Sequence, residues 1–366
     1  MTDPSNPYGP YINWTTFNGW ESSAADSVKD ASGQVKSAFY LGYTVTHLPG
    51  GRLAEIFGAK KIVCLSMLLS TLLAIATPLV CYLSLSPSGL VWVLYTIQMV
   101  LGLLQGVLYP SFSTVVSQWA PLSEKAKFIA FMCTGQNLGI ILTYPLCGLI
   151  MEYLSWTWVF YITSLITFAW LVLWFLLMSD YPEKDRLIGK DELNYILKSR
   201  LYNAQQMDQD KLIPLLPLIL DVLKSGRMWV VIVVQFCIYL GYSFIIIEGP
   251  DFLSKILPLG KEISSNGLYS ALPFLSMSII GPTVAIVVEY AISRKIISLI
   301  NGQRLCLMIG TLIPAAGLIG MTYLTAERHQ YYCIALLSIS FGFFGSTYSG
   351  IDSNINGLAP NRDGNL

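Results

Sequence analysis

The chain has 366 residues, of which 54% are apolar and only 12% are charged. A soluble globular protein carries about 25% charged residues, so this composition excludes a surface solvated by water on all sides. The 22 basic and 22 acidic side chains cancel, and the balance supports neither a basic nucleic-acid-binding surface nor an acidic tail. Composition therefore predicts a membrane protein, and the distribution of its charges becomes the informative feature.

Long stretches without charge predict the membrane spans. Residues 62–123 contain no charged side chain, and as one helix they would be about 93 Å long, against a bilayer core of about 30 Å. This segment must therefore cross twice, with a turn marked by Pro87 and Gly89. Seven further stretches, apolar and almost free of charge, bring the prediction to nine spans in an all-α, polytopic membrane protein: 37–57, 128–151, 153–179, 228–247, 263–288, 305–326 and 330–351.

The basic residues predict the topology. Alternating the loops puts 17 of the 22 basic side chains on one side of the bilayer and five on the other. The positive-inside rule makes the first side cytoplasmic, so the N-terminus is extracellular or luminal and the C-terminus is cytoplasmic. Asn13 begins a glycosylation sequon on the outer side. The predicted organisation is an outer tail at 1–33, an N-terminal half at 34–178, a cytoplasmic linker at 179–227, a C-terminal half at 228–350 and a cytoplasmic end at 351–366.

Two short loops share one charge pattern, in which an acidic residue is followed five and six residues later by two basic ones. The pattern predicts a latch, because the carboxylate that closes one helix can pair with cations that open the next. Such a latch would bias a transporter between outward-open and inward-open states. The alternative is that short cytoplasmic loops simply collect basic residues. The predicted latch residues are Arg52, Glu55, Lys60, Lys61, Glu289, Arg294 and Lys295.

The first of these loops resembles the signature loop of the major facilitator superfamily. It reads Gly51-Arg-Leu-Ala-Glu-Ile-Phe-Gly-Ala-Lys-Lys61. With Gly106-Val-Leu-Tyr-Pro110, Trp119-Ala-Pro-Leu-Ser-Glu124, Trp158-Val-Phe-Tyr161 and Ser293-Arg-Lys-Ile-Ile-Ser298, it is similar to the anion–cation symporters of that superfamily, which include sodium-phosphate cotransporter-like proteins, sialin and vesicular glutamate transporters. The resemblance implies a twelve-helix fold from which about three helices are missing, with family helices 2–6 in the N-terminal half and 7–10 in the C-terminal half.

The resemblance also implies a function. It indicates a secondary transporter of inorganic phosphate or small organic anions that works by alternating access, with sodium or a proton as coupling ion and no other cofactor. The alternative is a non-transporting truncated product that associates with or inhibits a full-length relative, whereas a complete chain would be a monomer. The predicted partners are a small anion and the lipid bilayer, in either a plasma or a lysosomal or vesicular membrane. No catalytic motif or metal-ligand cluster indicates an enzyme.

Uncharged hydrogen-bonding side chains within the spans are the candidates for anion binding. The resemblance places Gln98 and Gln105 where the family often carries an arginine and an acid, and such neutral amides can bind an oxyanion but cannot take up a proton. Tyr43 and His47 share a helix face, and the adjacent amides of residues 136 and 137 would be unfavourable facing lipid. The alternative for each tyrosine is an interfacial or packed position. The predicted substrate-binding residues are Tyr43, His47, Gln98, Gln105, Gln136, Asn137, Gln235, Tyr239 and Asn354, with no metal site.

Overall fold

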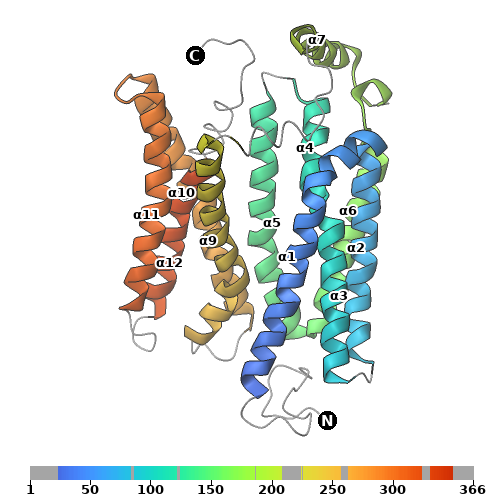
Figure 1. Ribbon diagram of the computed structural model, residues 1–366, viewed down its shortest axis with the longest axis vertical. Helices are drawn as coiled ribbons and strands as arrows, with labels where there is room; N and C mark the ends of the chain where they lie inside the picture. The colour runs from blue at the N-terminus through green and yellow to red at the C-terminus, as the bar shows by residue number, and fades with distance from the viewer. Residues whose placement is uncertain are drawn as a thin grey trace. The chain divides into compact units, whose positions relative to one another are not determined.

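The computed structural model describes residues 24–83, 86–121, 124–185, 187–207, 224, 226–256, 263–323 and 330–348. Within these residues the regular structure is entirely helical (Figure 1), which confirms the predicted all-α class. Besides a short 3-10 turn at Pro182–Lys184, the helices are α1 (Ala24–Phe57), α2 (Ala59–Cys81), α3 (Pro87–Gly106), α4 (Leu108–Trp119), α5 (Lys125–Tyr153), α6 (Trp156–Leu177), α7 (Lys190–Met207), α9 (Gly226–Ile256), α10 (Ile263–Ser293), α11 (Leu299–Thr322) and α12 (Gln330–Phe344).

Most of these helices have the length and apolarity of membrane spans. Six segments of the described chain qualify: Ala59–Cys81, Ser88–Trp119, Trp156–Leu177, Trp229–Leu253, Ser264–Ser293 and Leu299–Thr322. The three remaining predicted spans coincide with α1, α5 and α12. Of these, α1 and α5 are long but richer in polar residues, and the described part of α12 has 15 residues. The total of nine spans therefore stays a prediction.

The turn predicted inside the longest uncharged segment is confirmed. Helix α2 ends at Cys81 and α3 begins at Pro87. The side chain of Ser86 caps α3 by accepting a hydrogen bond from the backbone N–H of Gly89, at 3.2 Å. Proline is favoured in the first helical turn because its missing N–H would have no partner there, so the Ser-Pro pair starts the new helix.

The helices group into two compact units. Unit 1 comprises residues 1–132 and 154–209, and unit 2 comprises 133–153 and 210–366. In unit 1, α1 packs along α3 and α4, and α2 packs on α6; in unit 2, α12 packs against both α10 and α11. Most of α5 therefore groups with the helices that follow the linker, whereas the predicted halves divide the chain at the linker itself.

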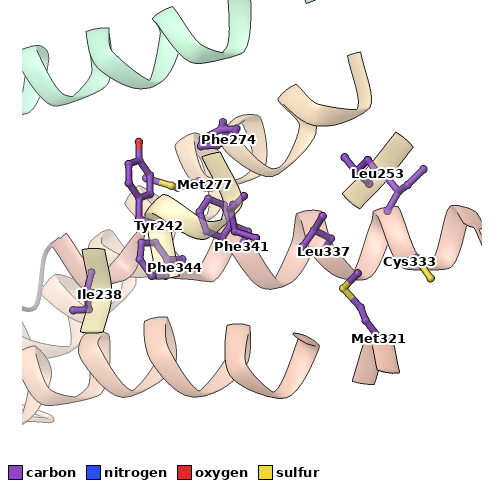
Figure 2. Close-up of a cluster of buried hydrophobic side chains, with 12 residues drawn as sticks. Ile238, Tyr242, Leu253, Phe274, Met277, Met321, Cys333, Leu337, Phe341 and Phe344 are labelled. Atoms are coloured by element: carbon purple, nitrogen blue, oxygen red, sulfur yellow. The ribbon is translucent and has the colours of Figure 1, made fainter. Parts of the chain in front are cut away.

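The core of unit 2 is a cluster of buried hydrophobic side chains that includes four aromatic rings (Figure 2). The rings of Phe341 and Phe344 stack with their centroids 5.1 Å apart, and Tyr242 of α9 stacks on both, at 6.2 and 6.1 Å. Phe274 of α10 meets Phe341 edge to face at 5.6 Å. The cluster joins three helices through buried aromatic surface, which explains why α9, α10 and α12 form one unit.

Candidate functional site: polar residues in the spans and a charged loop

Three stacked rings form a polar group in unit 1. The ring centroids of Tyr43 and His47, both on α1, lie 5.3 Å apart, and those of His47 and Tyr109 of α4 lie 6.1 Å apart. Tyr43 and His47 are half-buried. The Nδ1 atom of His47 is buried and has no hydrogen-bond partner among the described residues. The stack therefore holds an imidazole nitrogen whose hydrogen-bonding capacity a ligand could use.

Close packing of α1 on α3 fixes this stack. The hydroxyl of Thr46 donates a hydrogen bond to the backbone oxygen of Leu103, at 2.7 Å. A Cβ atom added to Gly106 would overlap the backbone oxygen of Tyr43, so any larger residue would push the helices apart. The backbones therefore lie in contact along this face, and the rotation of α1 that sets the direction of Tyr43 and His47 is determined by α3.

Two amides on α3 border this helix contact. Gln98 and Gln105 are half-buried and seven residues apart, so they lie on one face of the helix. Gly102 lies between them, and a Cβ atom there would overlap the backbone oxygen of Phe39 on α1. The predicted pair thus lies beside the α1–α3 contact, where its amide groups can donate to an anion without carrying charge.

In unit 2, the first part of α5 presents an open polar face. Gln136 is exposed and Asn137 is half-buried. A Cβ atom added to the neighbouring Gly135 or Gly139 would have no heavy atom within 4 Å. The amide of Gln136 therefore lies on a helix face that other described residues leave uncovered.

Helix α9 carries the other predicted residues of unit 2. Gln235 and Tyr239 are four residues apart, and Tyr239 is 52% exposed. The Oε1 atom of Gln235 is buried and lacks a hydrogen-bond partner among the described residues. The hydroxyl of Tyr144 donates to the backbone oxygen of Ile246, at 2.9 Å, and so ties α5 to α9. The amides of residues 136 and 137 lie on α5 and the amide of residue 235 lies on α9. Within unit 2, these two helices are joined by the hydrogen bond from Tyr144 to Ile246.

The signature loop makes contacts that differ from the predicted latch. Glu55 pairs with Arg52 on the same helix, with Nη1 and Oε2 2.8 Å apart, and both side chains are about half exposed. The backbone N–H of Lys60 donates to Oδ1 of Asp180 at 2.7 Å, and the Nζ atom of Lys60 lies 4.9 Å from the ring centroid of Phe175. The clamp across this loop therefore joins α2 to the end of α6 through Asp180. A gating role for the loop stays a prediction.

The tight turn of this loop depends on Gly58. Its φ of 93° lies in the region that favours glycine. A Cβ atom added to Gly58 would lie 2.8 Å from Oδ2 of Asp180, which is too close. Glycine is thus required at position 58 for two reasons. The positive φ favours it, and a side chain there would clash with the carboxylate of Asp180 that caps α2.

The second loop is arranged differently. The Nε atom of Arg294 donates to the hydroxyl of Tyr290 at 3.1 Å, and its guanidinium lies 5.2 Å from that ring centroid. Lys295 has a φ of 58° at the turn. Glu289 forms no ion pair with Arg294 or Lys295, all three of which the structure describes. The charge pattern is shared by the two loops, but the contacts are not.

The last predictions concern a glycosylation site, one substrate-binding residue and metal binding. Asn13 and Asn354 lie outside the described residues, so their roles stay predictions. The part of the chain that the structure describes holds no group of three or more His, Cys, Asp or Glu side chains that could bind a metal ion.

The sequence matches the model of the Major Facilitator Superfamily over residues 11–364. The chain belongs to the Major Facilitator Superfamily. It is thus an integral, multi-pass membrane protein, and the interpretation that it is not an enzyme is confirmed by this membership.

Several members of this superfamily are similar to the chain. Sialin of Homo sapiens is 30% identical over 92% of this chain and 65% of its own length. A protein of Drosophila ananassae named for inorganic phosphate cotransport is 27% identical, over 91% of this chain and 67% of its own length. Vesicular glutamate transporter 1 of Bos taurus is 27% identical, over 90% of this chain and 56% of its own length. The chain therefore spans about two thirds or less of the length of these relatives.

A solved structure of the superfamily has the same fold. The xylose transporter XylE of E. coli, in a partially occluded inward-open conformation, matches with a TM-score of 0.61 and 17% identity, over 92% of this chain and 75% of its own. At this identity the match shows the fold alone.

Two structural residues of this major facilitator chain were not singled out from the sequence. Asp180 caps α2, as described above, and Glu152 at the end of α5 accepts a hydrogen bond from the backbone N–H of Ser264 in α10, at 2.9 Å. Hydrogen bonds from Ser264 lower the pKa of the Glu152 carboxyl. The available signal was position, because each acid directly follows a long apolar run. The partner helices, 120 and 112 residues away, could not be identified from that signal.

Proposed function

We propose that this chain is a secondary transporter of small anions, either inorganic phosphate or organic anions, that works by alternating access with sodium or a proton as coupling ion. One observation supports this above the others: relatives named for phosphate cotransport and for glutamate transport align with about nine tenths of the chain. Because relatives with different named substrates share the alignment, an anionic substrate is a stronger proposal than any particular anion.

The chemistry of the spans supports an anion. The candidate residues are tyrosine, histidine, glutamine and asparagine, which donate hydrogen bonds without bringing a charge into the bilayer. His47 and Gln235 each hold a buried polar atom without a hydrogen-bond partner among the described residues. Such atoms are unfavourable unless a ligand or water satisfies them. A protonated Nδ1 of His47 can donate to an anion, whereas Oε1 of Gln235 accepts and would bind a donor group of the substrate or a water. We therefore place substrate binding at the ring stack of unit 1 and at the amides of unit 2.

The same residues bear on whether sodium or a proton is coupled to transport. The amides at positions 98 and 105 cannot bind a proton, so they favour sodium coupling or uncoupled transport. His47 carries the one imidazole among the described residues, and an imidazole can take up a proton where an amide cannot, so proton coupling would run through this residue.

Uptake into proteoliposomes tests the proposal. Purified chain is reconstituted, and entry of labelled phosphate, glutamate or urate is measured under a sodium gradient, a pH gradient or neither. We expect one anion to accumulate, and we expect His47→Ala and Gln235→Ala to reduce its uptake at least tenfold. Gln303→Ala, on α11, is the matched control and should leave uptake near the wild-type rate. No uptake of any anion by correctly inserted protein would refute transport by this chain.

The alternative is a non-transporting product that associates with or inhibits a longer relative. The observation that favours it is the coverage of 65% of human sialin. It would correspond to nine spans, with about three of the twelve family helices lacking. Co-expression with such a relative separates the two proposals, because an inhibitor lowers the relative's uptake and is captured with it, whereas an independent transporter does neither.

The proposed orientation puts the N-terminus outside or in the lumen and the C-terminus in the cytoplasm, in a plasma, lysosomal or vesicular membrane. It rests on the 17 basic residues assigned to one side. A glycosidase-sensitive decrease in mass that Asn13→Gln abolishes would support it. Protease cleavage of a C-terminal tag from outside intact cells would overturn it.

A further inference from the structure

A crevice in unit 1 lies between α2 and α6. It has a volume of about 640 Å³, and its walls are apolar. The side chains that line its length are exposed to different degrees, from 7% for Leu171 to 68% for Leu176. In a span of a membrane protein, such exposed apolar walls face lipid chains. The wall residues are Leu65, Leu68, Val172, Phe175 and Leu176.

One end of the crevice is charged. Lys60, Lys61 and Asp180 line it there, at the end of α6 and the start of α2. The carboxylate of Asp180 is held by the backbone N–H of Lys60, at 2.7 Å. Neither lysine forms an ion pair with a carboxylate of the described residues. The three side chains together carry a net charge of +1, and the N-terminus of α2 adds further positive potential.

We propose that this crevice binds one anionic phospholipid from the adjacent leaflet, with its phosphate against Lys60 and Lys61 and an acyl chain along the apolar walls. The dimensions fit, because eight residues of helix separate Lys60 from Leu68, which is a length of about 12 Å. Basic pockets between membrane helices at the bilayer surface are suited to anionic head groups. The site does not depend on anion transport by the chain.

Both features of the crevice are needed to choose this occupant. A free phosphate ion would use the lysines but would leave the apolar walls uncovered. A second protein helix would cover the walls but would bury two ammonium groups that have no carboxylate partner among the described residues, which is unfavourable. A phospholipid with a neutral head group would leave the positive end uncompensated. Only an anionic diacyl lipid satisfies the lysines and the walls together.

Lipid binding to the purified full chain tests the proposal. Native mass spectrometry measures the affinity of phosphatidylglycerol and phosphatidylcholine with identical acyl chains. We expect wild-type protein to retain one phosphatidylglycerol selectively. Each lysine near a membrane surface changes the affinity for anionic lipid about fivefold, so Lys60→Gln with Lys61→Gln should weaken phosphatidylglycerol binding about thirtyfold. The Lys60→Gln change keeps the backbone N–H that Asp180 accepts, so the fold is preserved.

Two further variants separate the head-group and acyl contributions. Arg294→Gln with Lys295→Gln removes the same charge from the second loop, where Arg294 already contacts Tyr290, and should leave phosphatidylglycerol binding within about twofold of wild type. Val172→Trp narrows the crevice with the lysines intact and should weaken both lipids. Equal binding of the two lipids by wild type, or unchanged binding in the lysine variant, would overturn the proposal. Displacement by glycerol phosphate without acyl chains, or a second copy of the chain in place of lipid, would overturn it as well.

Discussion

Removing the carboxylate of Asp180 should destabilise the packing of α2 on α6. The residue before α2 is Gly58, which has no side chain to cap the helix. Oδ1 of Asp180 supplies the missing acceptor, at 2.7 Å from the backbone nitrogen of Lys60. Loss of a helix-capping acceptor typically lowers stability by about 1–2 kcal/mol. We therefore expect Asp180→Ala to lower the free energy of unfolding by about that amount, and Asp180→Asn, which keeps an acceptor oxygen but loses the charge, by about 0.5 kcal/mol.

Unfolding in mixed detergent and SDS micelles, followed by tryptophan fluorescence, provides the measurement. Trp174 lies in α6 and the indole of Trp119 donates to the backbone oxygen of Ser179 at 3.0 Å, so both report on this region. Glu192→Ala, at an exposed acid in α7, is the control and should change stability by less than about 0.5 kcal/mol. The capping argument fails if Asp180→Ala unfolds at the wild-type SDS fraction, or if the alanine and asparagine variants are equally destabilised.

Three more predictions address acid sensitivity, helix packing and gating. The hydrogen bonds from Ser264 lower the pKa of Glu152 in the folded state, so this carboxylate stabilises the fold above its unfolded pKa of 4.5 and loses that contribution as the pH falls through the lower folded pKa. Glu152→Gln should therefore reduce the drop in melting temperature that acidification below pH 4.5 causes. Gly102→Leu should separate α1 from α3 and lower the yield of folded protein in size-exclusion chromatography, whereas Gly33→Leu, at a site with nothing within 4 Å, should not. Glu55→Gln should lower anion uptake at unchanged membrane insertion, and wild-type uptake would count against a gating role.

The six spans that the described helices bear out could be predicted because the bilayer imposes a strong and local constraint. Backbone groups in lipid must be satisfied within the segment, so a long uncharged run can be recognised as helix without any knowledge of its neighbours. The turn before α3 followed from Pro87 and Gly89 for the same reason, since local backbone chemistry decides it. The shared helix face of Tyr43 and His47 also followed from sequence, because residues four apart lie on one face, and the structure shows that their rings stack there.

Contacts between distant helices could not be predicted in this way. The spacing of acids and bases indicated that Glu55 would pair across the turn, yet Arg52, three residues earlier on the same helix, lies closer to it. Asp180 reaches α2 because α6 packs on α2, which no local pattern reveals. The grouping of residues 133–153 with α9 and α10 has the same origin, since the contacts that accompany it include hydrogen bonds from Tyr144 to Ile246 and from Ser264 to Glu152.

The contacts of Asp180 and Glu152 indicate how this chain uses charge at the ends of its helices. Each carboxylate lies near the end of one helix, Glu152 in the last turn of α5 and Asp180 just after α6, and accepts from the backbone N–H of the second residue of another, Ser264 in α10 and Lys60 in α2. In each unit an acid thus caps one helix and joins it to another. The acceptor oxygen of the acid therefore contributes more to stability than pairing with an opposite charge does. The two acids lie in different units and share no hydrogen-bond partner, and sites without shared partners usually contribute independently. The loss of stability in the double variant Asp180→Ala with Glu152→Gln should therefore equal the sum of the single losses. A double variant that differs from that sum would show that the two caps belong to one cooperative network.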